Sequence, residues 1–145
     1  MDKKYEGLKL SNQVCFPLYA ASRAVIKRYT PYLKELDLTY TQYIAMMVFW
    51  EEKKLTVKDL GKKLFLDSGT LTPVLKSLET KGYVTRQRSK EDERVLEVEI
   101  TPKGEDLKEK AVKVPQSMAS CIAMTPEEAG TLYGLLYKLL DSIEE

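Results

Sequence analysis

Two cysteines are the residues best suited to redox chemistry in this chain, which contains no histidine. The absence of histidine excludes a serine–histidine–aspartate triad, a histidine general base and a histidine-ligated metal site. Two cysteines cannot supply the four ligands of a structural zinc site, and we expect neither a metal nor another cofactor. Cys15 lies among the apolar residues Val14, Phe16 and Leu18, which is the usual setting of a small core residue.

Tyrosines could assist a thiol by donating a hydrogen bond, and the chain has nine of them, an unusual number for 145 residues. Tyr19 lies one helical turn beyond Cys15, on the same face of a helix. Pro17 leaves two arrangements open. The helix either kinks just after Cys15, or a helical segment starts near Phe16 and places Cys15 at its N-terminus, where unpaired N–H groups favour a thiolate.

Length and composition indicate a single globular domain with no membrane partner. The chain has 145 residues, of which 43% are hydrophobic and 31% charged, as in ordinary soluble domains. The longest apolar run spans residues 43–50, far short of the ~20 residues that a membrane helix needs. Residues 1–6 lead into no apolar core of a signal peptide, so we expect a cytoplasmic protein.

The net charge of +1 conceals a strong asymmetry along the chain. Residues 53–90 carry 10 basic and 3 acidic side chains, whereas residues 91–145 carry 6 basic and 13 acidic ones. A basic segment between neutral and acidic flanks indicates a surface that faces a polyanion, although lysine-rich helix faces are also commonly just solvated.

Hydrophobic spacing predicts a mainly helical chain with one hairpin. Thr39 or Thr41 can cap the second helix, and Thr56 and Thr101 the third and fifth. Pro31 is expected to bend or stop the first helix near Thr30. The predicted helices cover about 8–36, 40–53, 55–64, 67–81, 102–114 and the segment after Thr125, and the predicted strands cover 83–88 and 95–100.

A helix, a short turn, a second helix and a charged hairpin in this order predict a winged helix-turn-helix. The second helix would enter the major groove of DNA, which admits one helix, and the hairpin would lie beside it. Arg94 at the hairpin tip suits a narrow minor groove, and Asp92 could orient it by a bidentate pair. The predicted DNA-binding residues are Ser68, Gly69, Thr70, Thr72, Lys76, Arg86, Arg88, Lys90, Asp92 and Arg94.

Residues 67–79 and 86–94 resemble the recognition helix and wing of the MarR family of bacterial regulators. Within that family, residues 13–19 and 38–43 resemble the organic hydroperoxide resistance regulators (OhrR). The resemblance implies a mainly α fold with a small β-hairpin wing and a homodimer held by intertwined terminal helices. It assigns residues 1–36 and 102–145 to dimerisation and residues 37–101 to DNA binding.

The resemblance also implies a redox mechanism. Cys15 corresponds to the sensor, whose oxidation by an organic hydroperoxide makes the repressor release a pseudo-palindromic operator. Phenols corresponding to Tyr29 and Tyr40 approach the sensor from the other subunit, so these residues join Tyr19 as expected supports of the thiolate. Cys121 lies near the place of a second cysteine that forms an intersubunit disulfide in some members, whereas others use a small thiol. Pro17 departs from the family pattern, in which an apolar residue other than proline is usual.

Three other functions remain open on the sequence. A MarR-type repressor could be relieved by a non-covalent aromatic or antibiotic ligand. A thiol peroxidase could use Cys15, but the nearest candidate arginine, Arg23, lies two turns away, and we therefore expect no enzyme. A winged helix could also serve protein contacts alone.

Overall fold

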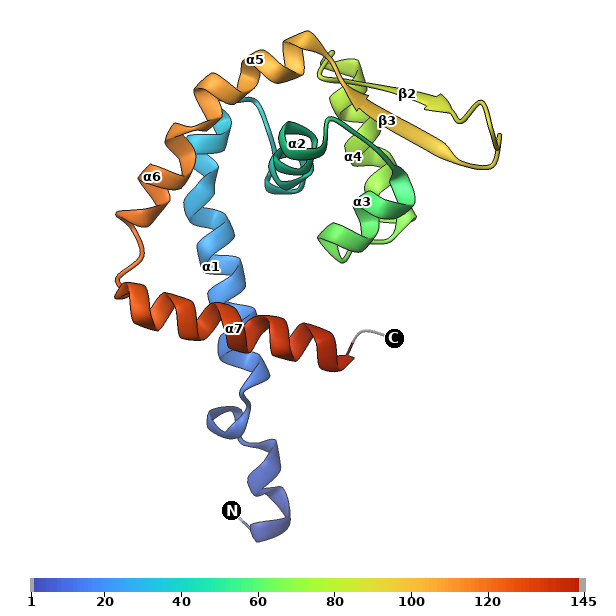
Figure 1. Cartoon of the computed structure of the whole chain (residues 1–145). Helices are drawn as coiled ribbons and strands as arrows, with labels where there is room; N and C mark the ends of the chain where they lie inside the picture. Colours follow the sequence, from blue (N-terminus) through green and yellow to red (C-terminus); the bar gives the residue numbers. More distant parts are fainter. Residues whose placement is uncertain (1, 144–145) are drawn as a thin grey trace.

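A computed structural model describes residues 2–143, which are mainly helical and include one small sheet (Figure 1). No helix in this range is long and apolar enough to cross a membrane. In chain order the elements are the 3-10 helices η1 (Lys3–Leu8) and η2 (Leu10–Asn12), α1 (Cys15–Lys34), α2 (Tyr40–Glu52), β1 (Lys54–Thr56), α3 (Val57–Leu64), α4 (Ser68–Thr80), β2 (Val84–Arg88), β3 (Leu96–Ile100), α5 (Pro102–Ala111), α6 (Lys113–Ala119) and α7 (Pro126–Ile143).

The hydrophobic core is centred on α2, which packs against α1, α3, α4, α5 and the sheet. Phe49 and Met46 of α2 are fully buried, as are Leu60 of α3 and Leu75 of α4. This explains the nearly continuous apolar run of the second predicted helix, because a central helix is covered on most of its sides. Between Leu33 and Met118 the chain therefore forms a complete core of its own.

The sheet has three antiparallel strands in the order β1-β3-β2. The hairpin of β2 and β3 confirms the two predicted strands. The strand β1 was not predicted, and residue 55 was wrongly assigned to the following helix. Leu55 instead pairs with Val98 of β3, and Thr56 both ends the strand and caps α3. A three-residue strand with no alternating pattern gives no signal until its distant partner is in place.

Helix α1 begins at Cys15, so the predicted start near residue 8 was wrong. Pro17 lies in the first turn, where its missing N–H breaks no helical hydrogen bond. Of the two arrangements left open by the sequence, the structure has the second, with Cys15 at a helix N-terminus. No side chain caps this end.

Pro31 also acts differently from the expectation. Pro31 does not stop α1 near Thr30, because the helix continues to Lys34. Pro31 has no backbone N–H, so one hydrogen bond is missing in the last turn of α1, where Pro31 itself is exposed. The fifth predicted helix ends at Ala111 rather than near residue 114, and Pro115 lies in the first turn of α6, where proline is tolerated.

Local capping was predicted correctly at three helices. The Thr39 hydroxyl accepts a hydrogen bond from the backbone of Gln42 and completes a capping box at α2. Thr56 and Thr101 cap α3 and α5 in the same way through their hydroxyl oxygens. These bonds satisfy N–H groups that a helix start otherwise leaves open.

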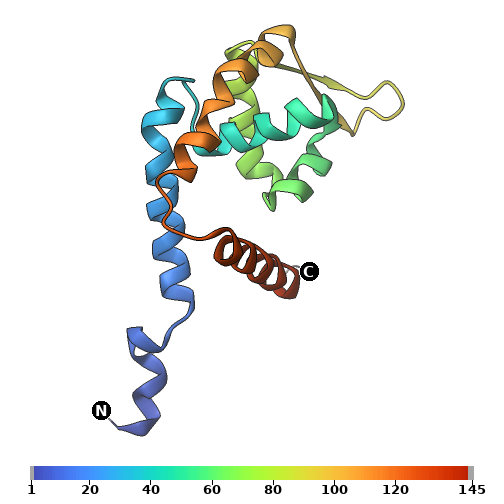
Figure 2. The ribbon, with the colours of Figure 1, turned by 60° about the vertical axis from the view of Figure 1, so that its left-hand side comes forward.

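The two ends of the chain contribute no buried residue to the core. Within residues 2–143, no residue before Leu33 and none after Met118 is buried. In the turned view, the N-terminal 3-10 helices project away from the body, and α7 lies apart from α1 (Figure 2). The large apolar side chains exposed on these segments are Tyr5, Leu8, Leu10, Val14, Phe16, Leu18, Tyr19, Val25, Ile26, Ile122, Met124, Leu132, Tyr133, Leu135, Tyr137, Leu139 and Ile143.

The helix-turn-helix provides a stability prediction with a matched control. A Cβ on Gly61 of α3 would lie 2.6 Å from the carbonyl oxygen of Leu66 in the following turn, whereas a Cβ on Gly69 of α4 would meet only Asp67 Oδ1 at 3.4 Å. We expect Gly61→Ala to lower the free energy of unfolding by about 1–3 kcal/mol, measured by urea denaturation. Gly69→Ala should leave it nearly unchanged, and equal losses in the two variants would contradict the prediction.

Candidate nucleic-acid interface and cysteine sites

A tight turn sets the second helix of the helix-turn-helix against the first. Phe65 ends α3 in the left-handed conformation, with φ at 57°. Asp67 then caps α4, its carboxylate accepting a hydrogen bond of 2.7 Å from the Thr70 N–H. This bond lowers the pKa of Asp67 below its ordinary value, since it favours the carboxylate. The start of α4 is therefore fixed at neutral pH.

The outer face of α4 carries the predicted DNA-contacting residues. Ser68, Thr72 and Lys76 follow one another at turn spacing and are all exposed. Gly69 and Thr70 lie beside them in the first turn, also exposed, while the leucines of α4 are buried on the opposite side. The Thr72 hydroxyl donates to the Ser68 carbonyl at 2.7 Å and keeps its lone pairs for an outside donor. The structure thus brings these five residues together on one accessible surface.

The tip of the wing holds the predicted pair of Asp92 and Arg94. Arg94 Nε donates to Asp92 Oδ1 at 3.1 Å and Nη2 to Oδ2 at 3.3 Å, a bidentate arrangement. Arg94 lowers the pKa of Asp92 through these bonds. The arginine side chain is still 91% exposed, so the pair sets its direction without covering it. Arg88 and Lys90 are exposed on the same hairpin.

Arg86, also among the predicted DNA-binding residues, is bonded to α4 within the chain. Its Nη2 and Nε donate to Glu79 Oε1 at 3.0 and 3.3 Å, and its backbone N–H donates to Glu79 Oε2 at 3.2 Å. The side-chain bonds hold the pKa of Glu79 below its usual range. Arg86 therefore ties β2 to α4 and fixes the angle of the wing, and its guanidinium is already engaged. No local pattern signals this contact, because it depends on the strand folding back onto the helix.

Three tyrosines form a cluster where α1 meets α2. The ring centroid of Tyr29 lies 5.0 Å from that of Tyr40 and 5.8 Å from that of Tyr43. Trp50 extends the cluster, 6.4 Å from Tyr43. Burial raises the pKa of Tyr29, Tyr40 and Tyr43, so all three phenols are protonated donors at neutral pH. Tyr43 and Trp50 were not among the predicted site residues.

Cys15 and Tyr19 lie at the opposite end of α1 from this cluster. Both are exposed, and Arg23 Nη1 donates to the Tyr19 hydroxyl at 3.3 Å. A straight helix from Cys15 to Tyr29 is about 21 Å long. The single chain therefore does not bring the predicted sensor together with Tyr29 and Tyr40.

Cys121 lies in the segment between α6 and α7 and contacts the C-terminal part of α1. Its Sγ is 3.5 Å from the Tyr32 hydroxyl and 3.4 Å from the Ser117 carbonyl oxygen. The bond to Cys121 raises the pKa of Tyr32. Sequence reasoning missed Tyr32, because nothing local connects it to a cysteine so distant in the chain. Among residues 2–143 there is no group of three or more carboxylate or cysteine side chains arranged to hold a metal ion.

Comparison with known proteins bears on both sites. Residues 27–111 match the family model described as "Transcriptional regulator SarA/Rot". The chain is 46% identical to the organic hydroperoxide resistance transcriptional regulator of Bacillus subtilis over 145 residues, which cover 100% of this chain and 99% of that protein. The chain belongs to the MarR family of winged-helix transcriptional regulators, in its organic hydroperoxide resistance branch.

Solved structures of this family have the same fold. Reduced AbfR bound to DNA superimposes with a TM-score of 0.80 at 35% identity, covering 97% of this chain and 99% of that one. AbfR, from Staphylococcus epidermidis, has also been solved as a disulfide-formed protein, with a TM-score of 0.66 at 36% identity, covering 94% and 96%. Escherichia coli MarR with operator DNA gives 0.76 at 26% identity, covering 97% and 99%. The predicted fold and family are confirmed.

Substitutions of Arg94 and Arg86 distinguish a residue that contacts DNA from one that holds the wing in position. Arg94→Ala should weaken binding to a specific duplex by about 1–3 kcal/mol and reduce the salt slope of binding, with the melting temperature unchanged. Arg86→Ala should weaken binding while also lowering the melting temperature, because Glu79 loses its partner. Fluorescence anisotropy at several salt concentrations and thermal unfolding make the comparison. Loss of stability with Arg94→Ala, or none with Arg86→Ala, would reverse the assignment.

Proposed function

We propose that the protein is a transcriptional repressor that binds a pseudo-palindromic operator and releases it when an organic hydroperoxide oxidises Cys15. The observation that carries the proposal is the exposed thiol of Cys15 at an uncapped helix N-terminus, with exposed apolar residues next to it in the sequence, in a chain of this family. Unpaired N–H groups in the first helical turn stabilise a negative sulfur. The apolar neighbours favour alkyl or lipid-like hydroperoxides over hydrogen peroxide. A regulator of chromosomal DNA of this kind acts in the cytoplasm.

The functional unit is a homodimer, because a single chain leaves its terminal helices uncovered. Apolar side chains on α1 and α7 stay exposed over most of both helices, and patches of this size on soluble proteins mark interfaces. A second copy is the natural occupant, since a two-fold axis covers identical faces with one another. The dimer would present two α4 helices one DNA turn apart. This supports the assignment of residues 1–36 and 102–145 to dimerisation.

The dimer also completes the redox site. Cys15 and the Tyr29–Tyr40 cluster lie at opposite ends of a rigid helix, about 21 Å apart in one chain. Two α1 helices that pack in opposite directions bring the cysteine of one protomer to the tyrosines of the other. The protonated phenols then donate hydrogen bonds to the thiolate, while Tyr19 supports it within the same chain.

Oxidation follows from this arrangement. The Cys15 thiolate attacks the outer oxygen of the hydroperoxide, an S–O bond forms as the O–O bond breaks, and two electrons pass from sulfur to the peroxide. The alkoxide leaves and takes a proton, giving an alcohol and a sulfenic acid. A thiol can then condense with the sulfenic acid, releasing water and forming a disulfide.

Cys121 is the resolving thiol of this proposal, acting across the dimer. Cys121 lies beside Tyr32, and Tyr32 is about 25 Å along α1 from Cys15. Even with the reach of both side chains, this exceeds the Cα separation of about 7 Å beyond which a disulfide cannot form. A disulfide between the two cysteines therefore joins different subunits. Where this disulfide does not form, a small thiol would condense with the Cys15 sulfenic acid instead.

The sensor role predicts a specific loss of response. Wild-type protein should bind the duplex upstream of its own gene when reduced, lose binding after stoichiometric cumene hydroperoxide and recover it with dithiothreitol. Cys15→Ser should bind the same duplex within about threefold of wild type and ignore the peroxide, since serine forms no sulfenic acid. A gel-shift titration measures this. Tight binding by wild type that peroxide leaves untouched would contradict the sensor and favour release by a non-covalent ligand.

The resolving role predicts a covalent dimer. Peroxide-treated wild-type protein should run as a dimer on a non-reducing gel, because the disulfide joins two subunits. Cys121→Ser should run as a monomer after the same treatment. A covalent dimer that persists in Cys121→Ser would exclude the resolving role.

A further inference from the structure

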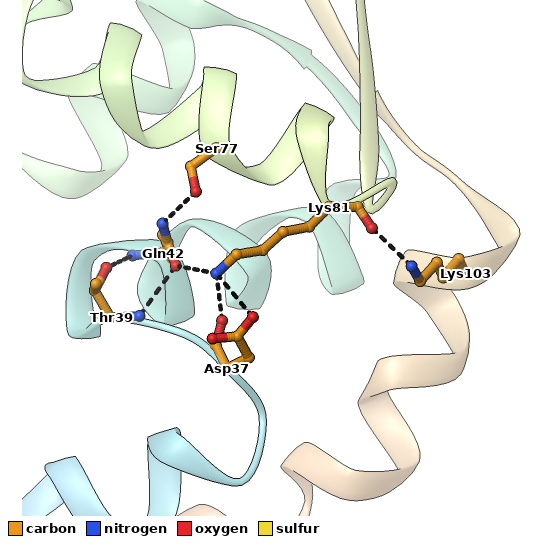
Figure 3. Close-up of polar contacts among 6 residues, drawn as sticks. All are labelled: Asp37, Thr39, Gln42, Ser77, Lys81 and Lys103. Carbon is orange, nitrogen blue, oxygen red and sulfur yellow. Dashed lines mark hydrogen bonds and ion pairs between the residues drawn. The ribbon is translucent and has the colours of Figure 1, made fainter.

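Gln42 is the buried polar side chain of the core, among residues 2–143, and it connects two parts of the molecule (Figure 3). Its Oε1 accepts from the Thr39 N–H at 3.0 Å, as part of the capping box of α2. Its Nε2 donates to the Ser77 hydroxyl of α4 at 2.9 Å. One side chain thus fixes the start of α2 and attaches it to the C-terminal half of α4.

Lys81, at the C-terminal end of α4, makes a second connection to the same place. Its Nζ donates to Gln42 Oε1 at 3.2 Å and to the backbone carbonyl of Asp37, and it lies 3.7 Å from Asp37 Oδ2. Asp37 forms the turn between α1 and α2 with a φ of 54°. The Lys81 carbonyl in turn accepts from Lys103 Nζ of α5 at 2.8 Å (Figure 3). The α1–α2 turn is therefore held on α4 by a charged group that is three-quarters covered.

The tyrosine cluster occupies the same turn of α2. Tyr40 and Tyr43 flank Gln42 in the sequence, and Tyr29 packs on both of their rings. Tyr43 is buried and Tyr29 and Tyr40 are partly buried against the core, so we expect a displacement of these rings to move the first turn of α2, because packed side chains do not shift independently. The bonds of Gln42 and Lys81 pass that movement directly to α4.

We propose that Gln42 and Lys81 are positioning residues that transmit the oxidation state of Cys15 from the tyrosine cluster to the recognition helix. The inference rests on the proposed function, since it requires the cluster to face the sensor of the other subunit. In the reduced protein, the bonds of Gln42 and Lys81 hold α4 in a fixed position relative to α2. The two α4 helices of the dimer are then positioned to bind DNA. When oxidation displaces Tyr29 and Tyr40, the start of α2 moves, and α4 moves with it away from the position that binds DNA.

A merely structural role makes a different prediction, which allows the two to be separated. If these bonds only stabilise the fold, breaking them weakens DNA binding by the same factor in the reduced and the oxidised protein. If they transmit the signal, breaking them reduces the ratio of the two affinities. The ratio of the two Kd values measures how strongly oxidation and DNA binding are coupled, and such couplings usually amount to about 5–150-fold.

The test compares full-length Lys81→Met and Ser77→Ala with a matched control, Lys34→Met. Lys34 is an exposed lysine near the end of α1 that lines, together with Lys81, a pocket beside the α1–α2 turn. Its replacement by Met therefore changes the net charge of this region equally. Ser77→Ala removes one bond of Gln42 and keeps the test available if Lys81→Met fails to fold, as judged by circular dichroism. Fluorescence anisotropy gives the Kd for DNA before and after stoichiometric cumene hydroperoxide, and free-thiol titration checks that Cys15 is equally oxidised.

We expect Lys81→Met to reduce the oxidised-to-reduced Kd ratio by about tenfold, Ser77→Ala to reduce it by less, and Lys34→Met to keep the wild-type ratio. Unchanged ratios in Lys81→Met and Ser77→Ala, with wild type responding, would overturn the transmitting role and leave the proposed function standing. A wild-type ratio of one would overturn the proposed function, and the inference with it.

Discussion

Apolar side chains on α1 and α7 that the chain itself does not cover are the constraint on which the rest of the structure depends. All of the buried residues lie between Leu33 and Met118 within the described range. Outside this segment, two long helices and the N-terminal 3-10 helices expose large apolar groups to solvent. Burial of such surface contributes roughly 25 cal/mol per Å², so a second copy stabilises both chains.

The same constraint explains how one small fold combines the proposed redox site with the proposed DNA-binding surface. The segment with its own core holds α4 and the wing in a fixed relation, through the Asp67 cap, the Glu79–Arg86 pair and the polar contacts of Gln42. The cysteines lie on segments without a core, where the thiols are accessible. The chemistry is therefore placed on the parts of the chain that depend on the partner, and the tyrosine cluster at the α1–α2 junction lies where the two parts meet.

The sequence predicted what local interactions decide. The caps at Thr39, Thr56 and Thr101 and the pair of Asp92 and Arg94 depend on residues two or three positions apart, and all of them form. The errors came from contacts between distant segments. The strand β1 exists because β3 lies beside it, and Arg86 turns inward because Glu79 faces it. Gln42 has a local capping partner in Thr39, but no local pattern marks its distant partners Ser77 and Lys81. Pro17 left open a kink just after Cys15 or a helix start beside it, because a proline inside a longer helix and a proline in a first turn look the same in the sequence.

A mixed dimer tests most directly whether the redox site is shared between subunits. One protomer carries Cys15→Ser with its tyrosines intact, and the other keeps Cys15 but carries Tyr29→Phe and Tyr40→Phe. If the phenols act across the dimer, the single Cys15 lies beside intact tyrosines and should react with cumene hydroperoxide at the wild-type rate in a stopped-flow thiol assay. If the phenols act within their own chain, this dimer should react as slowly as the Tyr29→Phe, Tyr40→Phe homodimer, and that result would contradict the account.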